Sequence, residues 1–371
     1  MAEEVDIKKI DKNMAFQNQT ADGMDWYTVD DEHFVLSGLA WRKKGEAFRR
    51  LPFDVFVSNG VNNLAWHTAG VMVRFSTDAS EIRINTRIDK TKNARMDHMA
   101  SVGSMGYDLY VGSGSDKIYT KSARFNHLLD EYNVTVFGPN APKKMREITI
   151  HFPLYSHPEF LEIGLSSGAQ LADPSNWVDD RPIVVYGTSI AQGGCASRPG
   201  MAHTNIMSRM LNRPFINLGF SGNGRGEKEM AQAMATIENP AMFVLDYDAN
   251  ALVAGLEATL SDFIDILRDK HPTVPILLVS RIPFARDFGE NFECSEEQFK
   301  YTTIHLNELG KRRAAGDQNI HYLEGSTLLG SNPLECTVDG VHPTDLGFYF
   351  MAERTAPVIG RILAHCGQKN S

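Results

Sequence analysis

The feature that most constrains the fold is a change in hydrophobic periodicity near the middle of the chain. Between residues 52 and 165, apolar residues occupy alternate positions in short segments, as in Val71, Val73 and Phe75. This period of two is typical of half-buried β-strands. Turn-forming residues such as Gly138-Pro139-Asn140 separate the segments, and no long helical stretch interrupts them. The first half therefore predicts an all-β antiparallel sandwich of the jelly-roll type.

From about residue 176 onward, strand-sized apolar runs alternate instead with helical stretches. The strand candidates are Ile183 to Tyr186, Phe215 to Leu218, Met242 to Asp246, Pro275 to Ser280 and Ile320 to Leu323. The helical stretches are Met201 to Leu211, Glu227 to Ile237, Leu256 to Lys270, Glu296 to Arg313 and Thr344 to His365. Strands that alternate with crossover helices predict an α/β domain with a parallel sheet.

The length of the chain agrees with two domains, because its 371 residues exceed twice the ~150 residues of an average domain. We place the β-sandwich domain at residues 1–175 and the α/β domain at residues 176–371. The segment Leu171 to Arg181 between them contains Pro174 and Trp177 and lacks the Gly/Ser composition of a free tether. We therefore expect the two domains to pack firmly on each other.

The charge balance and the apolar runs argue against several classes of partner. With 37 basic and 46 acidic residues the formal net charge is −9, which disfavours nucleic acid, because phosphate binding depends on Lys and Arg. No apolar run approaches the ~18–20 residues of a membrane span. Residues 1–10 lack the apolar stretch of a secretory signal, so we expect a cytoplasmic protein, or a periplasmic or secreted one whose signal peptide has been removed. The sequence does not indicate an oligomeric state.

Cysteine, histidine and glycine spacing points to no metal or nucleotide site. The four cysteines form no close pairs and are interpreted as packing residues rather than as disulfides or zinc ligands; they are Cys195, Cys294, Cys336 and Cys366. The 12 histidines show no HxxxH or HExxH spacing. The glycine-rich run that ends at Gly226 continues with Glu227 and lacks the Gly-Lys-Ser/Thr of a phosphate-binding loop. We therefore expect no cofactor and no metal.

Chemically useful residues gather directly after the predicted strands. The carboxyl ends of parallel strands meet at one edge of a sheet, where ligands bind. The segments concerned are Gly187-Thr188-Ser189, Ser221-Gly222-Asn223, Asp246 to Asn250 and, near the C-terminus, Asp339-Gly340-Val341-His342. The sequence therefore predicts a functional site at this edge.

These segments contain the groups that ester hydrolysis needs. Ser189 follows a strand at a Gly-containing turn and is the candidate nucleophile, and His342 is the candidate base. Asp339 lies three residues before His342, so its carboxylate can orient the imidazole. The backbone N–H groups of Ser189 and Gly222 and the side-chain amide of Asn250 are the candidate oxyanion hole.

Two further polar residues are candidates for contact with substrate. Asn223, beside Gly222, is the rival oxyanion donor and a candidate substrate contact. Arg198 follows Ser189 by nine residues in a loop rich in Gly and Pro, where it orders that loop, contacts substrate or forms a surface salt bridge.

In this order, the four blocks resemble those of the SGNH hydrolases, also called GDSL-type esterases. The resemblance implies a flavodoxin-like three-layer α/β fold. The residues Gly106-Tyr107-Asp108-Leu109-Tyr110 are similar to the Gly-x-Asp-Leu-Tyr signature of a two-domain subgroup with an N-terminal β-sandwich domain. Two departures stand out, because Thr188 replaces the aspartate before the nucleophile and the third block lacks the usual Gly before Asn-Asp.

The function expected from these residues and this resemblance is that of a serine esterase. It would remove small acyl groups, such as acetyl, from carbohydrate esters through an acyl-serine intermediate. The alternatives are a lipase or thioesterase that acts on longer acyl chains, and a catalytically silent glycan-binding protein. The resemblance alone carries the carbohydrate part of this expectation.

Overall fold

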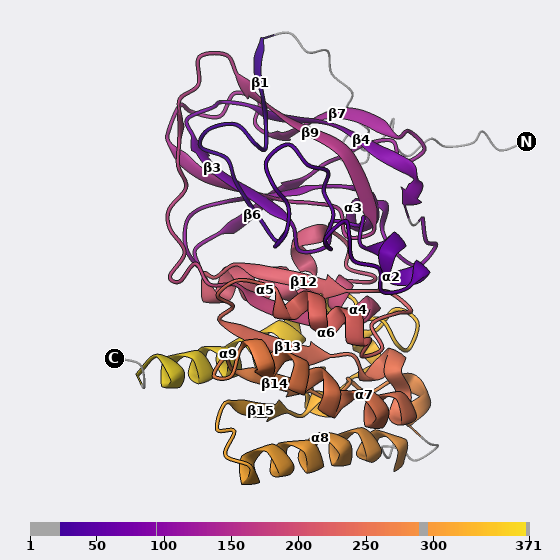
Figure 1. Ribbon diagram of the computed structural model, residues 1–371. Helices are drawn as coiled ribbons and strands as arrows, with labels where there is room; N and C mark the ends of the chain where they lie inside the picture. The colour runs from indigo at the N-terminus through magenta and orange to yellow at the C-terminus, as the bar shows by residue number, and fades with distance from the viewer. Residues whose placement is uncertain (1–22, 94, 289–295, 369–371) are drawn as a thin grey trace, which may run out of the picture.

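The computed structural model describes residues 23–93, 95–288 and 296–368, so residues 1–10 and Cys294 lie outside the described part. Its first half is a sandwich of two antiparallel sheets (Figure 1). One sheet has the order β1 (Met24–Thr28), β9 (Ser156–Ser166), β4 (Ile82–Asn93), β7 (Glu131–Phe137). The other has the order β10 (Leu171–Ala172), β3 (Met72–Thr77), β8 (Arg146–His151), β5 (Asp108–Val111), β6 (Ile118–Ser122), and β2 (Val35–Ser37) also pairs with β3.

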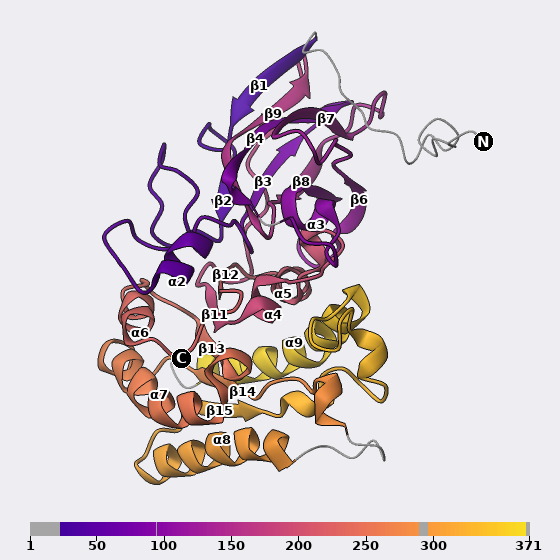
Figure 2. The ribbon, with the colours of Figure 1, turned by 90° about the vertical axis from the view of Figure 1, so that its right-hand side faces the viewer.

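The alternating apolar residues form the core of this sandwich, as the period of two predicts. Val73, Phe75, Ile84, Val134 and Ile150 are fully buried between the two sheets. Two short helices, α2 (Asn59–Leu64) and α3 (Ser101–Met105), lie on the side that faces the second domain (Figures 1 and 2). Both are too short to give a helical period in the sequence.

The second half is built on a five-stranded parallel sheet with the order 2-1-3-4-5 that is typical of flavodoxin-like folds. Its strands, in spatial order, are β12 (Phe215–Gly219), β11 (Ile183–Gly187), β13 (Met242–Asp246), β14 (Ile276–Val279) and β15 (Ile320–Leu323). Each matches a predicted strand within about one residue. The predicted α/β class and the preceding all-β domain are both confirmed.

Helices cover both faces of this sheet and complete the three layers. One face carries α4 (Ser189–Gln192), α5 (His203–Leu211) and α9 (Asp345–Gln368). The other carries α6 (Lys228–Ala235), α7 (Asp248–Lys270) and α8 (Glu296–Ala314). The connections include the short 3-10 helices η2 (Pro199–Met201), η3 (Ala285–Asp287), η4 (Gly325–Thr327) and η5 (Leu334–Cys336). None of the helices in the described residues is both long and apolar enough to span a membrane.

Helix α7 begins earlier than the sequence predicts. The expected start was Leu256, whereas the helix begins at Asp248 and is kinked at Leu252, whose φ is 59° and ψ 174°. This positive φ is costly for a residue with a β-carbon. The kink separates the first turn after β13 from the rest of the helix. That turn holds Asn250 directly beyond the strand.

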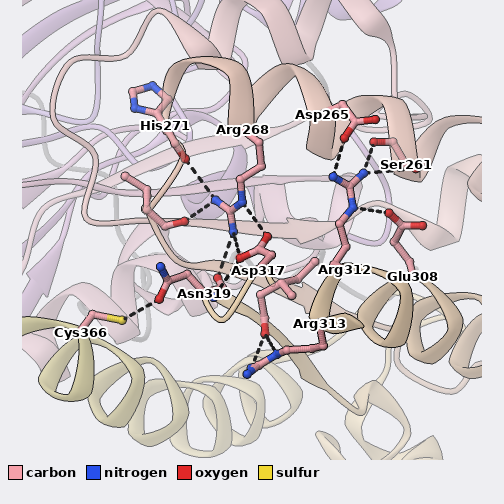
Figure 3. A network of polar contacts seen from close by, with 12 residues as sticks. Ser261, Asp265, Arg268, His271, Glu308, Arg312, Arg313, Asp317, Asn319 and Cys366 are labelled. Carbon is pink, nitrogen blue, oxygen red and sulfur yellow. Dashed lines mark hydrogen bonds and ion pairs between the residues drawn. The ribbon is translucent and has the colours of Figure 1, made fainter. Parts of the chain in front are cut away.

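Helices α7 and α8 are joined to each other, and to the residues before β15, by two half-buried arginines (Figure 3). Arg312 on α8 donates to Glu308 at 2.6 Å and to the carbonyl oxygen of Ser261 on α7 at 2.8 Å. Arg268 on α7 donates to Asp317 at 2.8 Å. These contacts lie toward the α8 and β15 end of the α/β domain, which is the end farthest from the β-sandwich domain (Figures 1 and 2).

The two domains share their hydrophobic cores, as the composition of the linker predicts. Leu51 and Val61 of the β-domain are buried in the cluster under α6 and α7. Met99 and Tyr155 are buried in the cluster under α5 and α9. The β-domain thereby covers the β12 edge of the parallel sheet (Figure 2).

Candidate active site

The strand ends bring Ser189, His342 and Asp339 into one hydrogen-bonded chain. Ser189 Oγ lies 2.9 Å from His342 Nε2. His342 Nδ1 lies 2.7 Å from Asp339 Oδ2, and the other oxygen of this carboxylate accepts the backbone N–H of His342 at 2.7 Å. The side chains of His342 and Asp339 are 23% and 34% exposed, so a ligand can reach these hydrogen-bonded side chains from solvent.

The local sequence explains the position of Ser189. It is the first residue of α4, directly after β11, and Thr188 is the N-cap of that helix. The Thr188 hydroxyl accepts the backbone N–H of Ile190 at 3.4 Å, which is how a capping residue satisfies a free helix N–H. The threonine thus keeps a bonding group in the turn where the resembling family has aspartate.

Hydrogen bonds hold Asp339 in its charged form. Burial acts in the opposite direction, but the backbone and side chain of His342 and the backbone of Val341 donate to the carboxylate and lower the pKa of Asp339. A charged carboxylate at Nδ1 fixes the tautomer of His342 that leaves Nε2 free to accept a proton.

The segment Ser221-Gly222-Asn223 and its neighbours Phe220 and Gly224, here called the glycine block, pack directly against the turn that holds the candidate nucleophile Ser189. The N–H of Phe220 donates to the carbonyl oxygen of Gly187 at 3.0 Å, and a β-carbon at Gly224 would lie 2.2 Å from that same oxygen. Gly222 has a φ of +65°, and no atom lies within 4 Å of the place where its β-carbon would be. The backbone at Gly222 is therefore open on this side, which suits a close approach to a ligand.

The two candidate asparagines lie in different surroundings. The Asn250 amide nitrogen donates to the carbonyl oxygen of Asn223 and, at 3.5 Å, to that of Phe220, so Asn250 is tied to the glycine block. The Asn223 amide donates to the carbonyl oxygen of Ser221 at 2.9 Å. A β-carbon at Gly60 of α2 would lie 2.3 Å from the Asn223 side chain, so this side chain faces the β-domain.

Several supporting residues were missed by the sequence analysis, because their contacts join positions 29 to 125 residues apart. Gln192 on α4 accepts the N–H of Ser221 at 3.0 Å and contacts His67 of the β-domain at 3.1 Å. The hydroxyl of Tyr155 donates to the carbonyl oxygen of Ser189 at 3.3 Å. These side chains tie helix α4, which begins at Ser189, to the glycine block and to the β-domain.

Arg50 of the β-domain supports the glycine block from the edge of the sheet. It is 1% exposed and donates to the carbonyl oxygens of Asn217 and Gly219 on β12 at 3.0 and 2.8 Å. It also donates to the carbonyl oxygens of Leu64 and His67. Burial lowers the pKa of Arg50 to about 9. Because β12 is an edge strand, these contacts supply partners that its outer carbonyls would otherwise lack.

Arg198 lies at the domain junction and bonds to the signature residues of the β-domain. It donates to Asp108 at 2.8 Å and to the Tyr110 hydroxyl, and its guanidinium carbon lies 3.8 Å from the centre of the Tyr119 ring. Asp108 also accepts the N–H of Gly200 at 2.9 Å. Of the three roles expected for Arg198, these contacts fit the ordering of the loop after Ser189, and the ion pair with Asp108 is buried rather than at the surface.

The Asp246 carboxyl group is a further unusual feature at the end of β13. Burial, together with the charge of Asp248, raises the pKa of Asp246 to about 8. In the sheet, Asp246 pairs with Gly187, the last residue of the strand that leads to Ser189. The uncharged form of this acid is therefore favoured, which reduces the negative charge beside Gly187.

Taken together, the described residues hold what acyl transfer needs: a hydroxyl bonded to an imidazole, a carboxylate on that imidazole, and N–H and amide donors on the neighbouring strand ends. Similar sets of groups occur on unrelated folds. Comparison with known proteins shows which of these folds and families the chain resembles.

Two family models match the chain. The GDSL-like lipase/acylhydrolase family matches residues 180–360. The GxDLY domain, the N-terminus of SGNH-hydrolase-type esterases, matches residues 24–171. No match was found among curated proteins.

Solved structures agree over nearly the whole chain. A GDSL-like lipase from Bacteroides ovatus is 29% identical with a TM-score of 0.82, and the match covers 92% of this chain and 98% of that one. A salicylyl-acyltransferase from a tetracycline biosynthetic pathway is 20% identical, with a TM-score of 0.71 and coverage of 92% and 99%. A family two carbohydrate esterase from Cellvibrio japonicus is 14% identical, with a TM-score of 0.59 and coverage of 92% and 98%. At these lower identities the likeness is one of fold. The chain belongs to the SGNH hydrolase (GDSL-type esterase) family, in the two-domain subgroup with a GxDLY domain, and is a carboxylic ester hydrolase.

Proposed function

We propose that this enzyme removes small acyl groups, such as acetyl, from carbohydrate esters through an acyl-Ser189 intermediate. The hydrogen-bonded chain of Ser189, His342 and Asp339 at the strand ends is the observation that carries this proposal. His342 takes the proton of Ser189 as the hydroxyl attacks the ester carbonyl, and it then passes that proton to the leaving sugar alcohol. In the second half of the reaction it activates water, which releases the acid and restores Ser189.

The negative charge that develops on the carbonyl oxygen requires donors on the opposite side. The backbone N–H groups of Ser189 and Gly222 take this role, and the open backbone at Gly222 supports the assignment. Asn250 supplies the third donor. In this structure the Asn250 amide nitrogen donates to the carbonyl oxygens of both Asn223 and Phe220, so the longer bond, to Phe220, would be exchanged for one to the ester oxygen.

Two observations support a small acyl group on a polar alcohol. A β-carbon at Gly194 would lie 2.7 Å from the Tyr155 hydroxyl and 3.3 Å from Cδ2 of His342, so the space beside the imidazole is narrow on this side. The amide of Asn223 stands between the glycine block and α2, where it offers a polar wall for sugar hydroxyls. The carbohydrate esterase from Cellvibrio japonicus shares the two-domain fold, which agrees with this substrate class.

A series of p-nitrophenyl esters tests the acyl preference. We expect the acetate ester to give the highest kcat/KM, with a steep fall toward the octanoate ester, and Ser189→Ala to be inactive on all of them. Acetate release from acetylated xylan, xyloglucan, pectin and sialic acid then identifies the alcohol. A preference for octanoate, or turnover of p-nitrophenyl acetate without acetate release from any of these carbohydrates, would contradict the proposal.

A further inference from the structure

A second histidine, His98, lies beside the Asp339–His342 pair and comes from the β-domain. It belongs to the connection between β4 and α3. One of its ring nitrogens, Nε2, lies 3.9 Å from Asp339 Oδ2, and its ring centre lies 5.9 Å from that of His342. Its side chain is 33% exposed. The esterase mechanism above has no step for this residue.

Cys195 completes a group of three potential metal ligands at this place. One ligand atom each from His98, Cys195 and His342 lie within 4.8 Å of one another. Among the residues that the structure describes, this is the only group of three or more His, Cys, Asp or Glu side chains so arranged. Cys195 is a free, half-buried cysteine in the loop after α4. Its φ of 76° places a non-glycine residue in the left-handed region, so its thiol is held here by an unusual backbone.

The ligand types and their spacing suit a borderline-soft cation. Zinc binds His nitrogen at about 2.0–2.1 Å and Cys sulfur at about 2.3 Å, so tetrahedral ligands stand about 3.3–3.8 Å apart. The observed upper limit of 4.8 Å requires shifts of about 1 Å, which side-chain rotations supply. Magnesium and calcium prefer oxygen ligands and do not fit this set.

The catalytic pair is already arranged as a zinc-binding histidine usually is. Asp339 accepts a hydrogen bond from Nδ1 of His342, which leaves the Nε2 lone pair directed away from the carboxylate. Histidines that bind zinc commonly donate their other nitrogen to a carboxylate in this way. The same arrangement that prepares His342 to accept a proton therefore prepares it to bind a metal ion.

We propose that His98, Cys195 and His342 bind a zinc-type divalent transition metal ion and that this binding switches the esterase off. The ion replaces the thiol proton of Cys195, which passes to solvent, and accepts the Nε2 lone pair of His342 and one lone pair of His98. Water fills the fourth position. With its lone pair on the metal, His342 can no longer take the proton of Ser189.

The inhibition rests on the proposed function, whereas the binding does not, so the two are measured separately. Calorimetry with zinc chloride on Ser189→Ala protein measures binding without any need for activity. We expect one ion per chain and no binding of magnesium or calcium. Adding His98→Ala or Cys195→Ser should weaken the Kd at least about tenfold, the loss that even an outer-shell partner of a metal site causes. Cobalt in place of zinc should give a thiolate charge-transfer band that Cys195→Ser removes.

Matched controls lie elsewhere in the chain. Cys366→Ser and His127→Ala change the same residue types outside the group and should leave the Kd unchanged. In the active enzyme, zinc should lower p-nitrophenyl acetate turnover, and EDTA should restore it. His98→Ala should raise the zinc concentration needed for half-inhibition by the same factor as it raises the Kd. The proposal would be overturned if the Ser189→Ala protein does not bind zinc, or if it binds zinc with the same Kd after His98 and Cys195 are replaced. An inactive wild-type enzyme would overturn the proposed function alone.

Discussion

Replacing Asp108 should destabilise the protein far more than a typical surface substitution. Its carboxylate is fully buried and accepts three hydrogen bonds, from Arg198 at 2.8 Å, from the backbone of Gly200 at 2.9 Å and from His151 at 3.0 Å. Burial opposes its ionisation, but the contacts with His151 and Arg198 lower the pKa of Asp108. It is therefore charged at neutral pH, and it joins the two domains.

The expected loss follows from what Asp108→Asn leaves behind. The asparagine keeps the volume but removes the charge that faces Arg198, whose side chain is only 18% exposed. Removing one partner of a buried ion pair costs about 3–5 kcal/mol, because the other charge stays buried without compensation. We expect the free energy of unfolding to fall by this amount.

Equilibrium urea unfolding of the full chain measures this change. Asp108→Asn should move the midpoint strongly downward, and adding Arg198→Met should recover part of the loss, because the double variant buries no lone charge. Glu131→Gln is the matched control, since it breaks an Arg–carboxylate pair whose side chains are about half exposed, and it should have a much smaller effect. A change within about 1 kcal/mol for Asp108→Asn would refute the reasoning.

Two other changes test the site and the pH dependence. Asn250→Ala should lower kcat by about 10²–10³ with little change in KM, because an oxyanion donor acts mainly in the transition state. Asn223→Ala is measured in parallel. If only Asn223→Ala loses kcat, the oxyanion donor is Asn223 and not Asn250. Burial lowers the pKa of His203 to about 4, below the ordinary ~6.5 of the unfolded chain. Between these two values the unfolded state binds more protons than the folded state, so the free energy of unfolding falls as the pH drops from ~6.5 to 4. His203→Leu should remove up to about 3 kcal/mol of this acid dependence in urea unfolding at pH 7 and pH 4.5, and an unchanged slope would contradict it.

The sequence predicts the strands of the parallel sheet well, because they depend on local pattern. Every strand of the parallel sheet is a short apolar run, and the residues just after such strands necessarily meet at one edge. Asp339 and His342 are separated by three positions, so their contact could be predicted without knowing the fold.

What the sequence could not predict depends on contacts between distant positions. Arg50 bonds to carbonyls about 167 positions away, and nothing in its neighbourhood indicates that it covers a sheet edge. His98 lies near His342 only because the β-domain docks on the α/β domain. The small helix α4 has four residues, too few to show a period. The residues that support the site were therefore harder to find than those that form it.

The most direct test of the central claim is to trap the acyl-enzyme. Wild-type protein is mixed with p-nitrophenyl acetate, quenched in acid, digested and examined by mass spectrometry. We predict one acetyl group on Ser189, no such adduct in Ser189→Ala, and a loss in that variant on the order of 10⁴–10⁶ in kcat with folding unchanged. Rapid turnover without acetylated Ser189, or near wild-type turnover by folded Ser189→Ala, would contradict the account.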